Sequence, residues 1–217
     1  MHLNAPIVGM AADAKTGGYW LVASDGGIFA FHAPFFGSTG AMHLNAPIVG
    51  MAATASGRGY WLVARDGGVF TFGDAKFHGS TGAMHLNAPI VGMAADAKTG
   101  GYWLVASDGG VFTFGAPFRG SRGGHPSASP VVGMTATADG GGYWLVARDG
   151  AVFPFGRAPS YGHVSGRALP EPVAAMALDA SGSCYVEAGA DGSIFCFGNP
   201  GYAWHGVVPN APIVGAS

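Results

Sequence analysis

The fold of this chain is decided by a short stretch, YWLVARDGGVFTF, at residues 60–72. Its first half is aromatic and β-branched, and its second half places phenylalanine at alternate positions. Asp66, Gly67 and Gly68 join the two halves, and Asp-Gly is among the dipeptides that best tolerate the positive φ of a tight hairpin turn. The stretch therefore predicts two antiparallel strands with a turn between them.

This hairpin recurs at a fixed period along the 217 residues. The aspartates of the turn lie 41 or 42 residues apart, at Asp25, Asp66, Asp108, Asp149 and Asp191. A methionine ahead of each hairpin keeps the same spacing, at Met10, Met51, Met93, Met134 and Met176. Both markers divide a single domain into five repeat units, 1–41, 42–83, 84–124, 125–172 and 173–209. Residues 210–217 begin a sixth unit, because NAPIVG at 210–215 repeats NAPIVG at 4–9.

Each unit is expected to hold four strands. An apolar run such as PIVGMAA at 47–53 comes first, the hairpin strands follow, and Phe77–Ser80 and its equivalents form a shorter fourth strand. Both faces of GYWLVA at 59–64 are apolar, which indicates a sheet covered on both sides. Four strands at this repeat length are typical of a propeller blade, so the predicted fold is all-β, a five-bladed β-propeller. A parallel β-solenoid is the alternative, although its rungs are shorter.

The composition excludes several classes of protein. Apolar residues make up 49% of the chain and charged residues 10%, the opposite of a disordered sequence. Gly, Pro or Asp interrupts every apolar run before it reaches the length of a membrane span. A net charge of −2 gives no reason to expect nucleic acid or an anionic membrane as a partner. No signal peptide is visible in MHLNAPIVGM, and two cysteines, Cys184 and Cys196, are too few for a disulfide framework.

Residues 45–83, NAPIVGMAATASGRGYWLVARDGGVFTFGDAKFHGSTGA, resemble the tandem repeats of actinobacterial secreted and cell-envelope proteins. The resemblance covers nearly the whole chain, although the fifth unit, CYVEAGADGSIFCFG at 184–198, lacks the tryptophan. It implies a secreted or cell-envelope location and repeats that often accompany a separate catalytic domain, with no activity of their own to carry over. The blade number also gives a distant architectural likeness to the tachylectin-type five-bladed lectins, and fold alone does not imply function.

No catalytic residue is predicted. The nucleophile motif G-x-S-x-G is absent, because GHVSG at 162–166 places its serine one position too late. The turn aspartates are expected to cap their own hairpins. Glu171 and Glu187, the only glutamates, could form an acid/base pair with Asp179, and solvated charges are the alternative.

Metal binding is considered and not predicted. His2, His43, His85 and His125 are assigned to one repeat position, where a closed ring could gather imidazoles for Cu, Ni or Zn. The fifth unit lacks this histidine, and five-fold spacing would hold the rings too far apart for one ion. No cofactor is predicted either, and the repeated methionines are expected to pack near a central channel.

Aromatic residues are the usual contacts of sugars, so their exposure matters. Trp20, Trp61, Trp103 and Trp144 lie in the middle of a strand that is apolar on both faces, which favours packing between blades. Trp204, in GYAWHG at 201–206, stands outside this series and is the expected exposed aromatic.

The loops that join units share one end of the propeller with the Asp-Gly turns. The ligand-binding residues predicted on this loop face are His2, Asn4, His43, Asn45, His85, Asn87, Arg65 and Arg148, together with Trp204. An asparagine amide offers both a donor and an acceptor to sugar hydroxyls, and a rigid scaffold commonly carries binding loops. The alternative is that each asparagine satisfies its local backbone in a turn.

The predicted function is a non-catalytic, multivalent, lectin-like module that recognises glycans or cell-wall polymer. The alternatives are a hydrolase of esterase or glycosidase type with its residues on the loop face, and a structural spacer of a larger envelope protein. The chain is expected to be a monomer or a strand-swapped dimer, because APIVG at 211–215 and at 5–9 could compete for one position.

Overall fold

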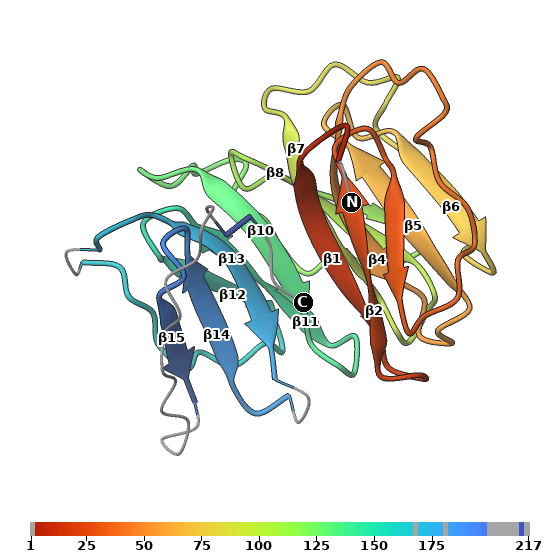
Figure 1. Cartoon of the computed structure of the whole chain (residues 1–217). Coiled ribbons are helices and arrows are strands. Elements are labelled where there is room, and N and C mark those ends of the chain that lie inside the picture. Colours follow the sequence, from red (N-terminus) through yellow and green to blue (C-terminus); the bar gives the residue numbers. More distant parts are fainter. Residues whose placement is uncertain (1–2, 167–168, 180–181, 199–212, 215–217) are drawn as a thin grey trace.

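The regular structure of the chain is entirely β in a computed structural model that describes residues 3–166, 169–179, 182–198 and 213–214 (Figure 1). Five separate antiparallel sheets contain three strands each. Sheet 1 is β1 (Ile7–Asp13), β2 (Gly18–Ala23) and β3 (Ile28–Phe31). Sheet 2 is β4 (Ile48–Ala53), β5 (Gly59–Ala64) and β6 (Val69–Gly73), and sheet 3 is β7 (Ile90–Ala95), β8 (Tyr102–Ala106) and β9 (Val111–Phe114). Sheet 4 is β10 (Val131–Ala136), β11 (Gly142–Ala147) and β12 (Val152–Gly156), and sheet 5 is β13 (Val173–Leu178), β14 (Tyr185–Gly189) and β15 (Ile194–Phe197).

The predicted hairpin forms in every sheet. In sheet 2, β5 pairs with β6 in a register that sets Trp61 opposite Thr71. Gly67 has a φ of 83°, and the Gly68 amide donates to the Asp66 carboxylate at 2.9 Å. The equivalent bond is made by Asp25, Asp108, Asp149 and Asp191. The prediction that the turn aspartates cap their own hairpins is therefore confirmed.

The fourth strand expected at Phe77–Ser80 does not form. Backbone groups that would join a ladder are used by a tyrosine of the next sheet instead. The His78 amide donates to the Tyr102 hydroxyl at 3.1 Å, and this hydroxyl donates to the Gly79 carbonyl at 2.6 Å. Gly79 also has a φ of 132°, which is outside the strand region. The segment after the third strand is therefore pinned to its neighbouring sheet through a side chain.

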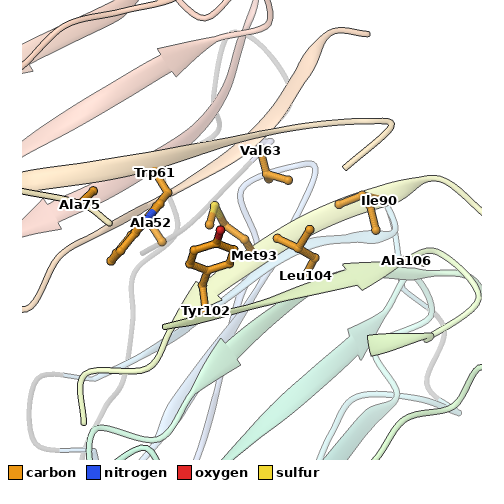
Figure 2. Close-up of a cluster of buried hydrophobic side chains, with 9 residues drawn as sticks. All are labelled: Ala52, Trp61, Val63, Ala75, Ile90, Met93, Tyr102, Leu104 and Ala106. Carbon is orange, nitrogen blue, oxygen red and sulfur yellow. The ribbon is translucent and has the colours of Figure 1, made fainter. Parts of the chain in front are cut away.

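Neighbouring sheets pack face to face through one repeated apolar cluster (Figure 2). Between sheets 2 and 3, Trp61 and Val63 meet Tyr102 and Leu104, and Trp61 is only 2% exposed. The ring centroids of Trp61 and Tyr102 are 5.5 Å apart. Equivalent clusters join sheets 1 and 2, 3 and 4, and 4 and 5. The tryptophan series is therefore buried between sheets as predicted, and it is not a sugar-stacking surface.

The first strands of the five sheets surround a narrow common channel of about 90 Å³ at one end. The repeated methionines line it, and four of them are buried, at Met51, Met93, Met134 and Met176. The prediction that they pack near the channel is confirmed. The position equivalent to Gly50 is alanine in sheet 5, at Ala175, and a Cβ on Gly50 would make an ordinary contact at 3.7 Å with the Gly92 Cα, so these strands do not require glycine here.

The two ends of the repeat series are not joined like consecutive sheets. The backbone carbonyl of the residue before each turn aspartate accepts a hydrogen bond from the first strand of the next sheet. The Arg148 carbonyl, for example, accepts from the Val173 amide at 2.9 Å. At sheet 5 the Ala190 carbonyl accepts this bond from Ile213 at 2.9 Å, so the C-terminal copy of the repeat takes the next position. Among the described strands none packs on the Tyr19 side of sheet 1, where Tyr19 is 38% exposed while Tyr60 of sheet 2 is fully buried.

Candidate functional site

The predicted loop face is exposed in the part of the chain that the structure describes. The exposed members of the predicted set are Asn4, His43, Asn45, Arg65, His85, Asn87 and Arg148. His2 and Trp204 lie outside the described residues. The backbone positions these loops: the Thr39 amide donates to the Gly26 carbonyl at 3.2 Å, and the Ile48 amide donates to the Ser24 carbonyl at 2.9 Å. Each loop is thus tied at both ends to the Asp-Gly turn of the preceding sheet, and its polar side chains project from a fixed frame.

The asparagine amides of this face are free to bind a ligand. Within the described residues, the side chains of Asn45 and Asn87 make no hydrogen bond to the protein. The turns that carry them are held by backbone bonds alone, such as the one from the Met84 amide to the Thr81 carbonyl at 2.8 Å. These asparagines therefore do not serve as local turn caps, and their donors and acceptors face solvent.

The histidine series is not a single repeat position. The His125 amide donates to the Arg122 carbonyl, as the amides of Met42 and Met84 do to Thr39 and Thr81. His125 thus takes the place of these methionines, and the position equivalent to His43 and His85 is occupied by Pro126. The assignment of His125 with His43 and His85 is wrong. Among residues 3–166, 169–179, 182–198 and 213–214, no three His, Cys, Asp or Glu side chains are grouped to hold a metal ion.

The possible acid/base pair is not assembled. Asp179 ends the β13–β14 hairpin, where its carboxylate accepts from the amides of Ser183 at 2.9 Å and Cys184 at 3.0 Å. Glu187 lies in the middle of β14 opposite Met176, three residues further along the strand than Cys184. At about 3.3 Å per residue the two carboxyls are set apart along the sheet. Glu171 is exposed on a loop.

Glu187 is fully buried between sheets 4 and 5, so its interpretation as a solvated charge is wrong. Neither of its carboxyl oxygens makes a hydrogen bond of good geometry, and the backbone amide of Val164 lies near enough only to oppose part of the pKa shift. Burial, with a further contribution from the nearby Asp149 charge, raises the pKa of Glu187 to about 8. The sequence contained this signal: Glu187 takes the position that leucine holds in the four other sheets, at Leu21, Leu62, Leu104 and Leu145.

A groove that the sequence did not predict lies between sheets 2 and 3, at the end away from the Asp-Gly turns. Its volume is about 350 Å³. Its floor is apolar and includes Trp61, Ala53 and Ala95. Its polar lining residues are Thr54, Ser56, Asp74, Lys76, His78, Asp96 and Thr99. The groove therefore combines an apolar base with polar groups around its edge, the usual character of a small-molecule site.

Hydrogen bonds hold both carboxylates of this groove in place. Asp74 accepts from the hydroxyls of Thr54 at 2.9 Å and Ser56 at 2.6 Å, and it pairs with Arg58 at 3.4 Å. The Ser56 hydroxyl in particular keeps the pKa of Asp74 below its ordinary value. Across the groove, Asp96 accepts from the Thr99 hydroxyl at 2.8 Å. Both carboxylates are therefore oriented by neighbouring hydroxyl groups.

One variable position determines whether each such groove is open. It is the residue before the glycine whose carbonyl accepts the tyrosine hydroxyl, occupied by Phe36, His78, Arg119 and Tyr161. Phe36 packs against Trp20 with centroids 6.3 Å apart, and Tyr161 stacks on Trp144 at the same separation. Arg119 reaches across to the Gly140 carbonyl at 3.2 Å. The His78 ring instead packs edge-on against Tyr102 with centroids 5.9 Å apart, and His78 and Trp61 both line the groove between sheets 2 and 3.

Exposed aromatic rings occur in a second repeated series. Phe35, Phe77 and Phe118 hold equivalent positions after the third strand of sheets 1, 2 and 3, and each is 60% exposed. The repetition of this exposed ring in three successive units makes the series a candidate contact surface. The sequence had suggested Trp204 as the exposed aromatic. The phenylalanine series was not predicted, although its spacing follows the repeat.

The arrangement suits binding. It offers exposed rings, free amides and one polar groove on a rigid frame, whereas the candidate acid/base groups are either engaged or buried apart. None of the described elements is a helix long and apolar enough to cross a membrane. No protein-family model and no curated protein matches this chain.

Proposed function

We propose that the chain is a five-bladed β-propeller that acts as a non-catalytic, multivalent, lectin-like module for glycans or cell-wall polymer. Five sheets packed in sequence around one channel support the fold. The resemblance of the repeats to actinobacterial secreted and cell-envelope proteins supports a location at the cell envelope or outside the cell.

The observation that carries the proposal is the equal 60% exposure of Phe35, Phe77 and Phe118. A phenyl ring buries much apolar area, and its face suits the C–H surface of a sugar ring. Rings that repeat on successive blades would meet successive residues of a polymer. The free amides of Asn45 and Asn87 add hydrogen-bonding groups on the loop face.

Repetition matters because each site on its own is shallow. Linked sites raise the effective concentration of the second contact, so a polymer can bind about 100-fold to 10,000-fold more tightly than one unit. The proposal therefore predicts weak binding of monosaccharides and strong binding of glycan polymer by the same chain.

A glycan array followed by calorimetry on purified cell-wall polymer tests this function. Replacing Phe35, Phe77 and Phe118 together by alanine is expected to weaken polymer binding at least about tenfold, because multivalent contacts are lost together. Met42 and Met84 are similarly exposed, at 57% and 56%, and their double alanine variant is the matched control. Absence of any glycan or cell-wall polymer bound by the unmodified chain would refute the function.

The loop-face residues have their own variant. Asn45→Ala with Asn87→Ala is expected to weaken binding if the asparagines contact the ligand, and unchanged binding places the site on the phenylalanines alone.

The oligomeric state is a further part of the proposal, as a monomer or a strand-swapped dimer. Measurement of the molecular mass in solution, with and without residues 210–217, distinguishes the two, since only a swapped dimer falls from the dimer mass to the monomer mass when this segment is removed.

A further inference from the structure

We propose that the groove between sheets 2 and 3 is a distinct subsite for a single neutral pyranose ring. The inference rests on the proposed glycan-binding function and names a place and a ligand class for it. The groove lies at the end away from the predicted loop face, so the two sites can be tested separately.

The first reason is that unit 2 differs from its counterparts at the positions that open the groove. Lys76 stands where the other units have Pro34, Pro117 and Pro159, all of which accept the tryptophan indole N–H through their carbonyls. Asp74 is an added residue relative to units 1 and 3, which have one residue fewer between phenylalanine and glycine here. His78 stands where Phe36, Arg119 or Tyr161 covers the equivalent groove. In a chain of near-identical repeats, three polar changes converge on one groove.

The second reason is the free hydrogen-bonding capacity of these groups. The side chains of Lys76 and His78 are exposed and form no hydrogen bond or ion pair with any described residue. The side chain of Asp74 is 38% exposed, and its ionised oxygens have lone pairs beyond those that Thr54 and Ser56 use. Donors and acceptors therefore face the same space, as alternating sugar hydroxyls require.

The third reason is the balance of charge and size. Arg58 already pairs with Asp74, and Lys76 lies across from Asp96, so neither an anion nor a cation gains a net attraction. The alanine methyls and Trp61 on the floor match the apolar face of a pyranose ring. The volume of about 350 Å³ is at the small end of ligand sites and accommodates one ring with some water.

An NMR titration tests the inference, with the indole N–H of Trp61 as the reporter. This group donates to the Lys76 carbonyl at 2.8 Å at the base of the groove. Trp20 and Trp103 make the same bond in covered positions, at 2.8 and 2.9 Å, and serve as internal controls. The probes are methyl α-D-glucopyranoside, methyl β-D-galactopyranoside and N-acetylglucosamine, with glucuronate and glucosamine as charged comparisons.

We expect at least one neutral probe to shift the Trp61 resonance saturably while Trp20 and Trp103 stay unchanged. His78→Phe introduces the residue that unit 1 carries and should weaken this binding at least tenfold. Lys76→Pro introduces the residue of three other units and should do the same. Retained chemical shifts of Trp20 and Trp103 show that each variant is folded.

Two results would overturn the inference: a Trp61 resonance that no neutral probe moves, or a shift with unaltered affinity in His78→Phe. Preference for glucuronate or glucosamine would also overturn the ligand class. Polymer binding on the array that survives in His78→Phe, with no Trp61 response, rejects the subsite and leaves the proposed function intact. Loss of array binding by the unmodified chain together with a Trp61 response rejects the multivalent function and leaves the subsite.

Discussion

Replacing Glu187 by leucine should stabilise the protein markedly at neutral pH. The carboxyl is fully buried between sheets 4 and 5, and neither of its oxygens makes a hydrogen bond of good geometry. Burial first, and then the Asp149 charge, raise its pKa from 4.5 to about 8. Leucine is the residue at this position in the other sheets, so the apolar side chain fits the cluster already present.

The magnitude follows from the two pKa values. Each pKa unit corresponds to about 1.4 kcal/mol, so the free energy of unfolding loses roughly 3 kcal/mol through Glu187 at pH 7. The sign is set by proton binding. Between pH 4.5 and about 8 the unfolded chain ionises Glu187 while the folded chain holds its proton, so stability falls as pH rises. Below pH 4.5 Glu187 is protonated in both the folded and the unfolded chain, so it no longer lowers the free energy of unfolding.

Urea unfolding followed by tryptophan fluorescence measures this, because Trp144 is buried in the same cluster. The difference in unfolding free energy between Glu187→Leu and the unmodified chain should grow by about 1.4 kcal/mol for each pH unit between 5 and 8. Glu187→Gln should remove the same pH dependence. Glu171→Gln, at an exposed glutamate, is the control and should leave it in place. A difference that stays constant from pH 5 to pH 8.5 would refute the reasoning.

Further predictions concern the pinned segments and the turns. Tyr102→Phe removes the hydroxyl that links His78 and Gly79 to sheet 3, and chemical denaturation should show a loss of about 1–2 kcal/mol. Tyr19→Phe, at the exposed tyrosine of sheet 1, should change stability by less than about 0.5 kcal/mol, and an equal loss in both variants would contradict the role of the hydroxyl. His32 has a φ of 52° where other units have glycine, so His32→Gly should raise the melting temperature by a few degrees, equivalent to about 0.5–1 kcal/mol. A lower melting temperature for His32→Gly would show that its side chain, and not its backbone, determines its contribution.

Much of the architecture could be predicted because it is local and repeated. The Asp66 turn, the two strands beside it and the burial of Trp61 all follow from neighbouring residues, and the repeat presents the turn and strands five times and the tryptophan four times. The exposure of Asn45 and Asn87 on the loop face was predicted in the same way. His125 was wrongly placed with His43 and His85, although its backbone bond and its distance from the turn aspartate match those of Met42.

What the sequence could not provide depends on contacts between units. Phe77–Ser80 reads as a strand, yet its backbone bonds go to Tyr102 of the next sheet, 24 positions away from His78. The open groove at His78 becomes visible only when Phe36, Arg119 and Tyr161 are seen to cover its counterparts. The sequence by itself thus determined the repeating hairpins and the side chains buried between them, because both are set by local pattern. Only the tertiary structure decided that Glu187 is buried without a hydrogen bond of good geometry, that one groove stays open and that Ile213 occupies the position after sheet 5, because each depends on which neighbour a unit meets.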